Sequence, residues 1–185
     1  MRDFVAFAAD VHRRNAKWWF TEDGVRLERD PGELNMLSVS ELAEAMEGVR
    51  KSKPGARPMD DKLPHRPMVE VELGDTVIRL TDTSEGLKIG LYTGIIDVRT
   101  TMDRPTPAAN LLDIVKAICQ FDDAIAGGDD QAARHWVSTA IALCYDYAEQ
   151  YGHDLDGAID EKLAYNDNRA DHSYAARKAA GGKAF

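Results

Sequence analysis

The sequence predicts an all-α protein with a single domain, on the strength of three observations. Apolar residues recur at the spacing of an amphipathic helix in several long segments. Turn-forming residues separate these segments, as in Asp23-Gly24, Asp30-Pro31-Gly32 and the four-proline stretch "KSKPGARPMDDKLPHRP". The chain has 185 residues, 44% of them hydrophobic and 30% charged, which is ordinary for one globular domain.

Five helices are expected in chain order, besides one ambiguous segment. The first places Phe4, Val11 and Trp18 on or near one face. Alanine, glutamate and methionine favour the second, two glycines separate the third from the fourth, and Asp154 or Asp156 is expected near the N-cap of the last. The expected helices cover residues 3–19, 34–51, 108–127, 130–152 and 154–172.

The stretch "MVEVELGDTVIRL", residues 68–80, allows two interpretations. A β-hairpin would explain why apolar residues alternate with Glu70 and Glu72, with Gly74-Asp75 as the turn. The alternative is a helix whose apolar face consists of Val69, Leu73, Val77 and Leu80. Gly74 costs a helix roughly 1 kcal/mol relative to alanine, and β-branched residues weaken it further, so propensity alone does not decide.

Composition excludes several classes of function. The formal charge of −9 argues against non-specific binding to a nucleic-acid polymer and against a polybasic membrane patch. No stretch approaches membrane-spanning length, and the apolar run before Asp10 is too short for a signal peptide, so we expect a cytoplasmic protein without a membrane partner. Cys119 and Cys144 lie in apolar helical contexts and are expected to be buried, reduced thiols.

Paired carboxylates are the pattern with the clearest chemical meaning. Glu41 and Glu44 are three residues apart and share a helix face. If residues 68–82 are also helical, Glu72 and Asp75 repeat this arrangement, and antiparallel packing of the two helices would bring four carboxylates together. Such a cluster needs cations, and its hard oxygen ligands suit Mg²⁺ or Mn²⁺, which in turn suit phosphate chemistry. The alternative is an ordinary solvated face, because the chain has 32 acidic residues.

Four segments, in order, resemble one protein family. "ELAEAMEGVRK" followed by "DDKLPHRPMVEVELGDTVIRL" is similar to the ExxE…ExxD signature of the MazG-like, all-α nucleoside triphosphate pyrophosphohydrolases, in particular the phage and bacterial dATP/dGTP diphosphohydrolases that include the MazZ type. "VHRRNAKWW", "DLDGAIDEKLAYNDNRADH" and the tail "AGGKAF" resemble further segments of that branch. The ExxD segment is helical there, so the resemblance implies a helix over residues 68–82 and a MazG-like helical bundle.

The resemblance also implies roles for individual residues. The metal-binding and catalytic carboxylates would be Glu41, Glu44, Glu72 and Asp75. The residues that reach the nucleoside, the phosphates or the ribose would be Asn15, Lys162, Asn166 and Arg169. From the residues themselves, Trp18 or Trp19 could stack on a base or belong to the core, and Lys62, just before the acidic helix, could contact phosphate. Lys162, Asn166 and Arg169 suit one helix face, which could equally be solvated.

The chain departs from short members of that branch by an apparent insertion at residues 87–151, which could enlarge the core or form an oligomer interface. Residues 86–107, at its start, are expected to be irregular and could contain a short hairpin. Asp82 could be an accessory ligand or an outer-sphere residue. We expect one MazG-like domain over residues 1–185 that forms a dimer or tetramer.

The expected activity is Mg²⁺-dependent hydrolysis of dGTP or dATP to the monophosphate and pyrophosphate, with Mn²⁺ as a possible substitute. Two alternatives stay open. The same fold could act on dUTP, dCTP or a damaged nucleotide, because a metal site handles only the phosphates. The chain could also be a non-catalytic helical interaction protein.

Overall fold

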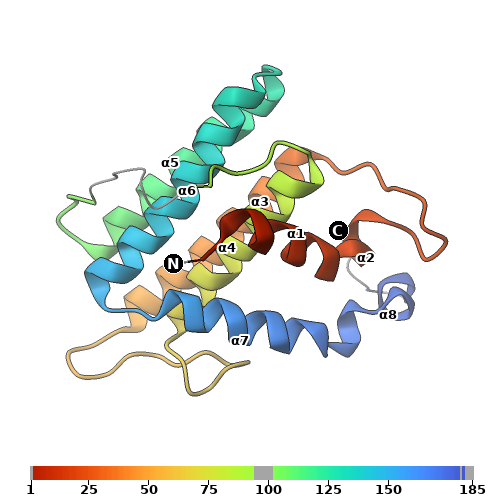
Figure 1. Ribbon diagram of the computed structural model, residues 1–185. Helices are drawn as coiled ribbons and strands as arrows, with labels where there is room; N and C mark the ends of the chain where they lie inside the picture. Colours follow the sequence, from red (N-terminus) through yellow and green to blue (C-terminus); the bar gives the residue numbers. More distant parts are fainter. Residues whose placement is uncertain (1, 94–101, 180, 182–185) are drawn as a thin grey trace.

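The computed structural model describes residues 2–93, 102–179 and 181, and every regular element among them is a helix (Figure 1). The all-α prediction is therefore confirmed. None of the described helices combines the length and the apolar character needed to cross a membrane. The helices are α1 (Phe4–Arg14), α2 (Ala16–Trp19), α3 (Pro31–Lys51), α4 (Met68–Gly86), α5 (Pro107–Ala126), α6 (Asp130–Tyr151), α7 (Leu155–Asp167) and α8 (Tyr174–Lys178), with a short 3₁₀ turn, η2 (Ala170–His172).

The first expected helix is divided in two. Asp3 caps α1 by accepting from the backbone N–H of Val5 and Ala6, but the helix ends at Asn15, whose φ of −90° and ψ of 6° lie outside the helical region. A separate short helix, α2, follows and ends at Trp19. The prediction of one continuous helix over residues 3–19 was wrong at this point, and the break changes the direction of the segment that carries both tryptophans.

The ambiguous stretch is helical, as α4, and forms an antiparallel pair with α3. The end of α3 lies against the start of α4, so closely that a Cβ added at Gly48 would come 2.8 Å from Cγ2 of Val69. Nearly all of α4 is buried, since α1, α3, α6 and α7 all pack against it. Burial on every side explains why its sequence shows neither a clean helical stripe nor a clean alternation.

The α5–α6 hairpin supplies the region that the sequence marked as an insertion, and both of its expected helices are confirmed. α5 packs on α3 and α6 packs on α4, so Ile114, Phe121, Val137 and Ile141 belong to the same hydrophobic cluster as the rest of the chain. The hairpin thus enlarges the core. The described residues on either side of 94–101 form no strand, and the remainder of the short hairpin considered for this region lies outside the described residues.

Arg66 fixes α7 against α4. Its guanidinium donates to Glu70 at 2.5 Å, to Glu161 at 2.8 Å and to Asp154 at 3.2 Å, and Asp154 is also the N-cap of α7. The hydrogen bond from Arg66 holds the pKa of Glu161 down to about 2, helped by His65. This clamp sets the position of α7, the helix that carries Lys162.

Two glycines of α4 lead to opposite predictions. A Cβ at Gly86 would overlap the indole ring of buried Trp19, so Gly86→Ala is expected to lower the free energy of unfolding by about 2 kcal/mol. A Cβ added at Gly74 would lie 3.5 Å from the nearest atoms, on Ile159, which is an ordinary contact distance. Gly74→Ala is therefore expected to raise the free energy of unfolding by up to about 1 kcal/mol. Urea denaturation of both variants tests the pair, and equal effects would contradict it.

Candidate metal centre and adjoining cleft

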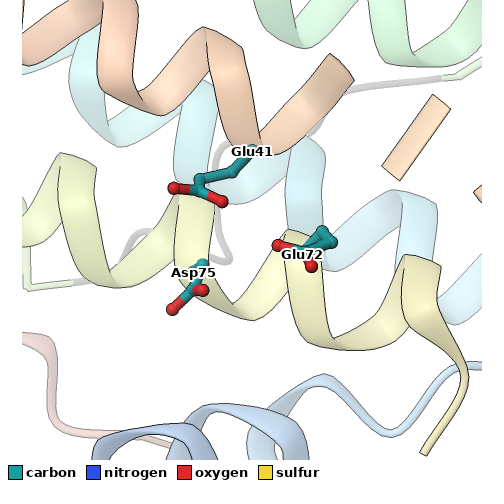
Figure 2. Close-up of side chains that lie close together, drawn as sticks. All are labelled: Glu41, Glu72 and Asp75. Carbon is teal, nitrogen blue, oxygen red and sulfur yellow. The ribbon is translucent and has the colours of Figure 1, made fainter. Parts of the chain in front are cut away.

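Three carboxylates converge between α3 and α4, two of them buried and the third partly buried, and we call them the carboxylate cluster: Glu41, Glu72 and Asp75 (Figure 2). Each offers an oxygen within 4.8 Å of the oxygens of the other two. Glu72 and Asp75 lie one turn apart on α4, and Glu41 faces them from α3. Glu41 is only 6% exposed and Glu72 only 1%, so these acids are not on an ordinary solvated face.

The fourth predicted ligand, Glu44, stands apart from the cluster. It lies one turn beyond Glu41 on α3, and its side chain is exposed. Its charge nevertheless acts on Glu72, because it helps to raise the pKa of that acid. The structure thus brings together three of the four predicted carboxylates and leaves Glu44 at the edge.

The electrostatics of the cluster are dominated by burial. Burial raises the pKa of Glu72 to about 9; Asp75, Glu41 and Glu44 push it in the same direction, and Lys162 opposes them. The pKa of Asp75 is also raised by burial, again against the opposing charge of Lys162. This concentration of acids destabilises the folded state unless positive charge is nearby.

Two cationic side chains, one buried and one partly exposed, supply part of that charge. Nζ of Lys162 lies 2.7 Å from Oδ2 of Asp75, and Nε of Arg79 donates to Oε1 of Glu41 at 2.6 Å. Glu72 has no such partner: its buried Oε2 has no hydrogen-bond partner among the described residues. An orphaned buried oxygen beside two other carboxylates fits a hard divalent cation such as Mg²⁺ or Mn²⁺, which prefers oxygen ligands.

A cleft of about 290 Å³ meets the cluster at Asp75 and extends past α4 towards α2. This volume lies near the lower limit for small-molecule sites. Four of the predicted substrate-binding residues line it, namely Asn15, Trp18, Asn166 and Arg169. The other residues of its wall are Trp19, Arg29, Leu34, Leu37, Asp75, Ile78, Arg79, Asp82 and His172.

The two predicted lysines lie elsewhere. Lys162 is 1% exposed and sits behind Asp75, so it does not line the cleft. Lys62 lies outside the cleft, 3.4 Å from Asp61. Burial acts to lower the pKa of Lys62, but Asp61 and Glu72 more than offset this and the pKa is raised. Lys62 is therefore near the cluster electrostatically without reaching into the cleft.

Asp82 forms the far end of the cleft. Its Oδ1 accepts from Nδ1 of His12 at 2.8 Å and from Nε1 of Trp19 at 3.0 Å, and its Oδ2 accepts from Nδ2 of Asn15 at 3.0 Å. These three donors tie α1 and α2 to α4. The sequence suggested an accessory ligand or outer-sphere residue, and this arrangement makes Asp82 the anchor of one wall of the cleft.

The two tryptophans have different surroundings. Both line the cleft, but Trp19 is buried in the core, whereas Trp18 is partly exposed. The guanidinium carbon of Arg177 lies 4.4 Å from the centre of the Trp18 ring, and His172 meets that ring edge-on at 5.4 Å. Of the two, Trp18 is thus the candidate for stacking on a base, and the C-terminal segment braces its ring.

Sequence reasoning missed two arginines of the cleft. Arg79 follows Asp75 by one helical turn on the cluster face of α4, and this spacing was a signal that could have identified it. Arg29 lies in the irregular segment before α3, where no periodic pattern exists. Its Nη1 donates to the carbonyl oxygen of Trp18 at 2.7 Å.

Comparison with known proteins adds no family to these observations. The chain matches no family model, no curated protein and no solved structure at a significant level. Membership of the MazG-like family therefore stays a prediction that rests on the four sequence segments.

Proposed function

We propose that this chain is a Mg²⁺-dependent, MazG-like nucleoside triphosphate pyrophosphohydrolase that prefers a purine deoxynucleotide, dGTP or dATP. One observation carries the proposal: a cluster of three carboxylates borders, through Asp75, on a cleft that contains cationic side chains and a partly exposed tryptophan. The cluster suits a cation, the arginines suit phosphate, and the tryptophan suits a base. Few ligands other than a nucleotide present all three features in one molecule.

The cluster residues Glu41, Glu72 and Asp75 would hold the ion. Bound Mg²⁺ supplies neutralisation of phosphate charge and a lowered pKa for a bound water. Arg79 and Arg169, which line the cleft next to Asp75, would balance the charge that develops on the leaving pyrophosphate. Glu44, which is exposed one turn from the cluster, would orient the attacking water or accept its proton.

The other end of the cleft would bind the nucleoside. Trp18 offers a ring face to the base, and Asn15 is held by Asp82 with its amide nitrogen, which leaves its oxygen to accept a hydrogen bond. Asn166 has a buried Oδ1 with no hydrogen-bond partner among the described residues, and a sugar hydroxyl is a suitable donor. From Asp75 to Asp82 is two helical turns, about 10 Å, comparable to the span from phosphate to base edge in a nucleotide.

The alternative of a non-catalytic interaction protein loses its main support. That hypothesis treats the acidic faces as solvated, and Glu41 and Glu72 are buried. The hypothesis that the chain acts on a nucleotide with a different base involves the same metal chemistry. Only the measurement of activity on a panel of nucleotides separates it from the proposal. Assembly into a dimer or tetramer remains a prediction from the resemblance.

Pyrophosphate release from dNTPs and NTPs, with Mg²⁺, Mn²⁺ or EDTA, tests the proposal. We expect metal-dependent release that favours dGTP or dATP and falls on the order of 100-fold or more in Asp75→Asn. Glu47→Gln is the matched control, because Glu47 is on the same helix pair but pairs with surface Arg50 and Lys51. Release from a pyrimidine nucleotide would keep the reaction and change the substrate. No release from any nucleotide by the folded protein with metal would overturn the proposed function.

A further inference from the structure

Lys162 is an unusual neighbour for a metal site. Lysine is almost never fully buried unless it is paired with an acid. The side chain of Lys162 is 1% exposed, and the acid beside it is Asp75, whose Oδ2 lies 2.7 Å from Nζ. It arrives there because α7 packs closely on α4: a Cβ at Gly74 would lie 3.5 Å from the backbone nitrogen of Ile159 (Figure 1). The ammonium group therefore occupies one of the three carboxylates that would hold a cation.

The cluster without metal is partly balanced by the protein itself. Lys162 forms an ion pair with Asp75, and Arg79 forms one with Glu41. The buried Oε2 of Glu72 has no hydrogen-bond partner among the described residues. A divalent cation entering between the three acids would meet two positive side chains at close range. Repulsion between like charges in a buried site is strong, so these cations must be redirected when a metal binds.

The two cations differ in how easily they can be redirected. Arg79 lines the cleft and its side chain is 37% exposed, so water or a ligand reaches it directly. Lys162 is sealed behind Asp75, and a buried ammonium that loses its carboxylate without gaining another anion is costly. Its long, flexible stem allows the group to move to an anion placed in the cleft next to Asp75.

We infer that Lys162 is an internal counter-ion that occupies Asp75 until metal and phosphate bind together, and that it thereby couples the two binding events. A metal ion bound by Asp75 would displace the ammonium group of Lys162, and a phosphate in the cleft would pair with that ammonium group. Each ligand removes the cost that the other would face alone, so metal alone binds weakly and the coupling is reciprocal. This inference rests on the proposed function, since it assumes that phosphate occupies the cleft.

Binding of Mn²⁺ to the full-length protein by isothermal titration calorimetry, with and without inorganic phosphate, tests the coupling without turnover. In the wild-type protein, phosphate is expected to tighten Mn²⁺ binding at least about 5-fold. Lys162→Met keeps much of the stem and removes the charge, so it should bind Mn²⁺ alone about 10-fold more tightly than wild type, with the phosphate effect lost. Lys116→Met, at a lysine of α5 that pairs with Asp113 on the surface, should behave as wild type.

The outcomes separate this inference from the proposed function. Absence of phosphate coupling in the wild-type protein would overturn the inference whether or not Lys162→Met folds, and so would equal Mn²⁺ affinities and equal coupling in the two proteins. If pyrophosphate release stands while coupling is absent, the enzyme proposal survives and the counter-ion role falls. If neither protein binds Mn²⁺, both the counter-ion role and the metal site are wrong.

Discussion

Replacing Glu72 with glutamine is expected to raise the free energy of unfolding of the metal-free protein by about 3 kcal/mol at pH 7. Burial raises the pKa of Glu72 from its ordinary value of 4.5 to about 9 in the folded protein. Between these values the folded chain holds a proton that the unfolded chain releases. Stability is therefore fully present below about pH 4.5 and is lost as the pH rises towards 9, by at most about 1.4 kcal/mol per pH unit. Glutamine carries no charge at any pH and escapes this loss.

Urea denaturation in EDTA from pH 4 to pH 9 measures the effect. The wild-type and Glu72→Gln curves should agree near pH 4 and separate as the pH rises. Glu28→Gln is the matched control, because Glu28 is exposed and a surface change of this kind usually alters stability by less than about 0.5 kcal/mol. Parallel curves for wild type and Glu72→Gln would show that Glu72 is not a buried acid in solution.

Adding Mn²⁺ should reverse the order of the two proteins. A ligand that binds only the folded state stabilises it by mass action, and the wild-type cluster has three carboxylates where the variant has two. Wild type should therefore gain stability with metal concentration, and Glu72→Gln should gain little. The same residue is thus expected to destabilise the empty fold and to stabilise the occupied one, which is the pattern of a functional acid and not of a structural one.

Helical spacing predicted which carboxylates share a face, but spacing contains no information about depth. Glu41 and Glu44 are equivalent in the sequence pattern, yet Glu41 is buried against α4 and Glu44 is exposed. The difference arises from where α4 crosses α3, and a single helix pattern cannot encode that crossing. The same limit applies to α7, where Asn166 lines the cleft and Lys162 is buried behind Asp75, and Arg169, which also lines the cleft, lies beyond the end of this helix at Asp167.

The break at Asn15 was hidden for a different reason. Apolar spacing continues through it, with Val11 before and Trp18 after, so periodicity alone predicted one helix. The residue at the break, Asn15, makes a tertiary contact, the hydrogen bond to Asp82, which lies 67 residues away in the chain and cannot be read from local spacing. The helical assignment of α4 was ambiguous for a related reason, because a helix buried all round loses its amphipathic signature.

Replacing Asp82 with alanine is expected to lower the free energy of unfolding by about 3 kcal/mol. The carboxylate accepts from His12, Asn15 and Trp19, and its removal leaves three donors in or near the core without an acceptor. Trp19 suffers most, since its indole N–H is buried and water cannot replace Asp82 there. Asp82→Asn should lose less, because its amide oxygen still accepts, although its nitrogen then faces a donor.

Asp113→Ala is the control that distinguishes a buried acceptor from a surface ion pair. Asp113 also has several donors, from Arg104 and Lys116, but the lysine is largely exposed and water can solvate both cations, so the loss should be below about 1 kcal/mol. Equal losses in Asp82→Ala and Asp113→Ala would contradict the role of Asp82 as a buried acceptor.

The contacts of Asp82 also predict a specific pattern of binding: Asp82→Asn should weaken nucleotide binding, because Asn15 and Trp18 lose their position, while leaving Mn²⁺ binding to the carboxylate cluster unchanged. A parallel loss of metal binding would mean that Asp82 acts on the metal centre itself and not through the wall of the cleft.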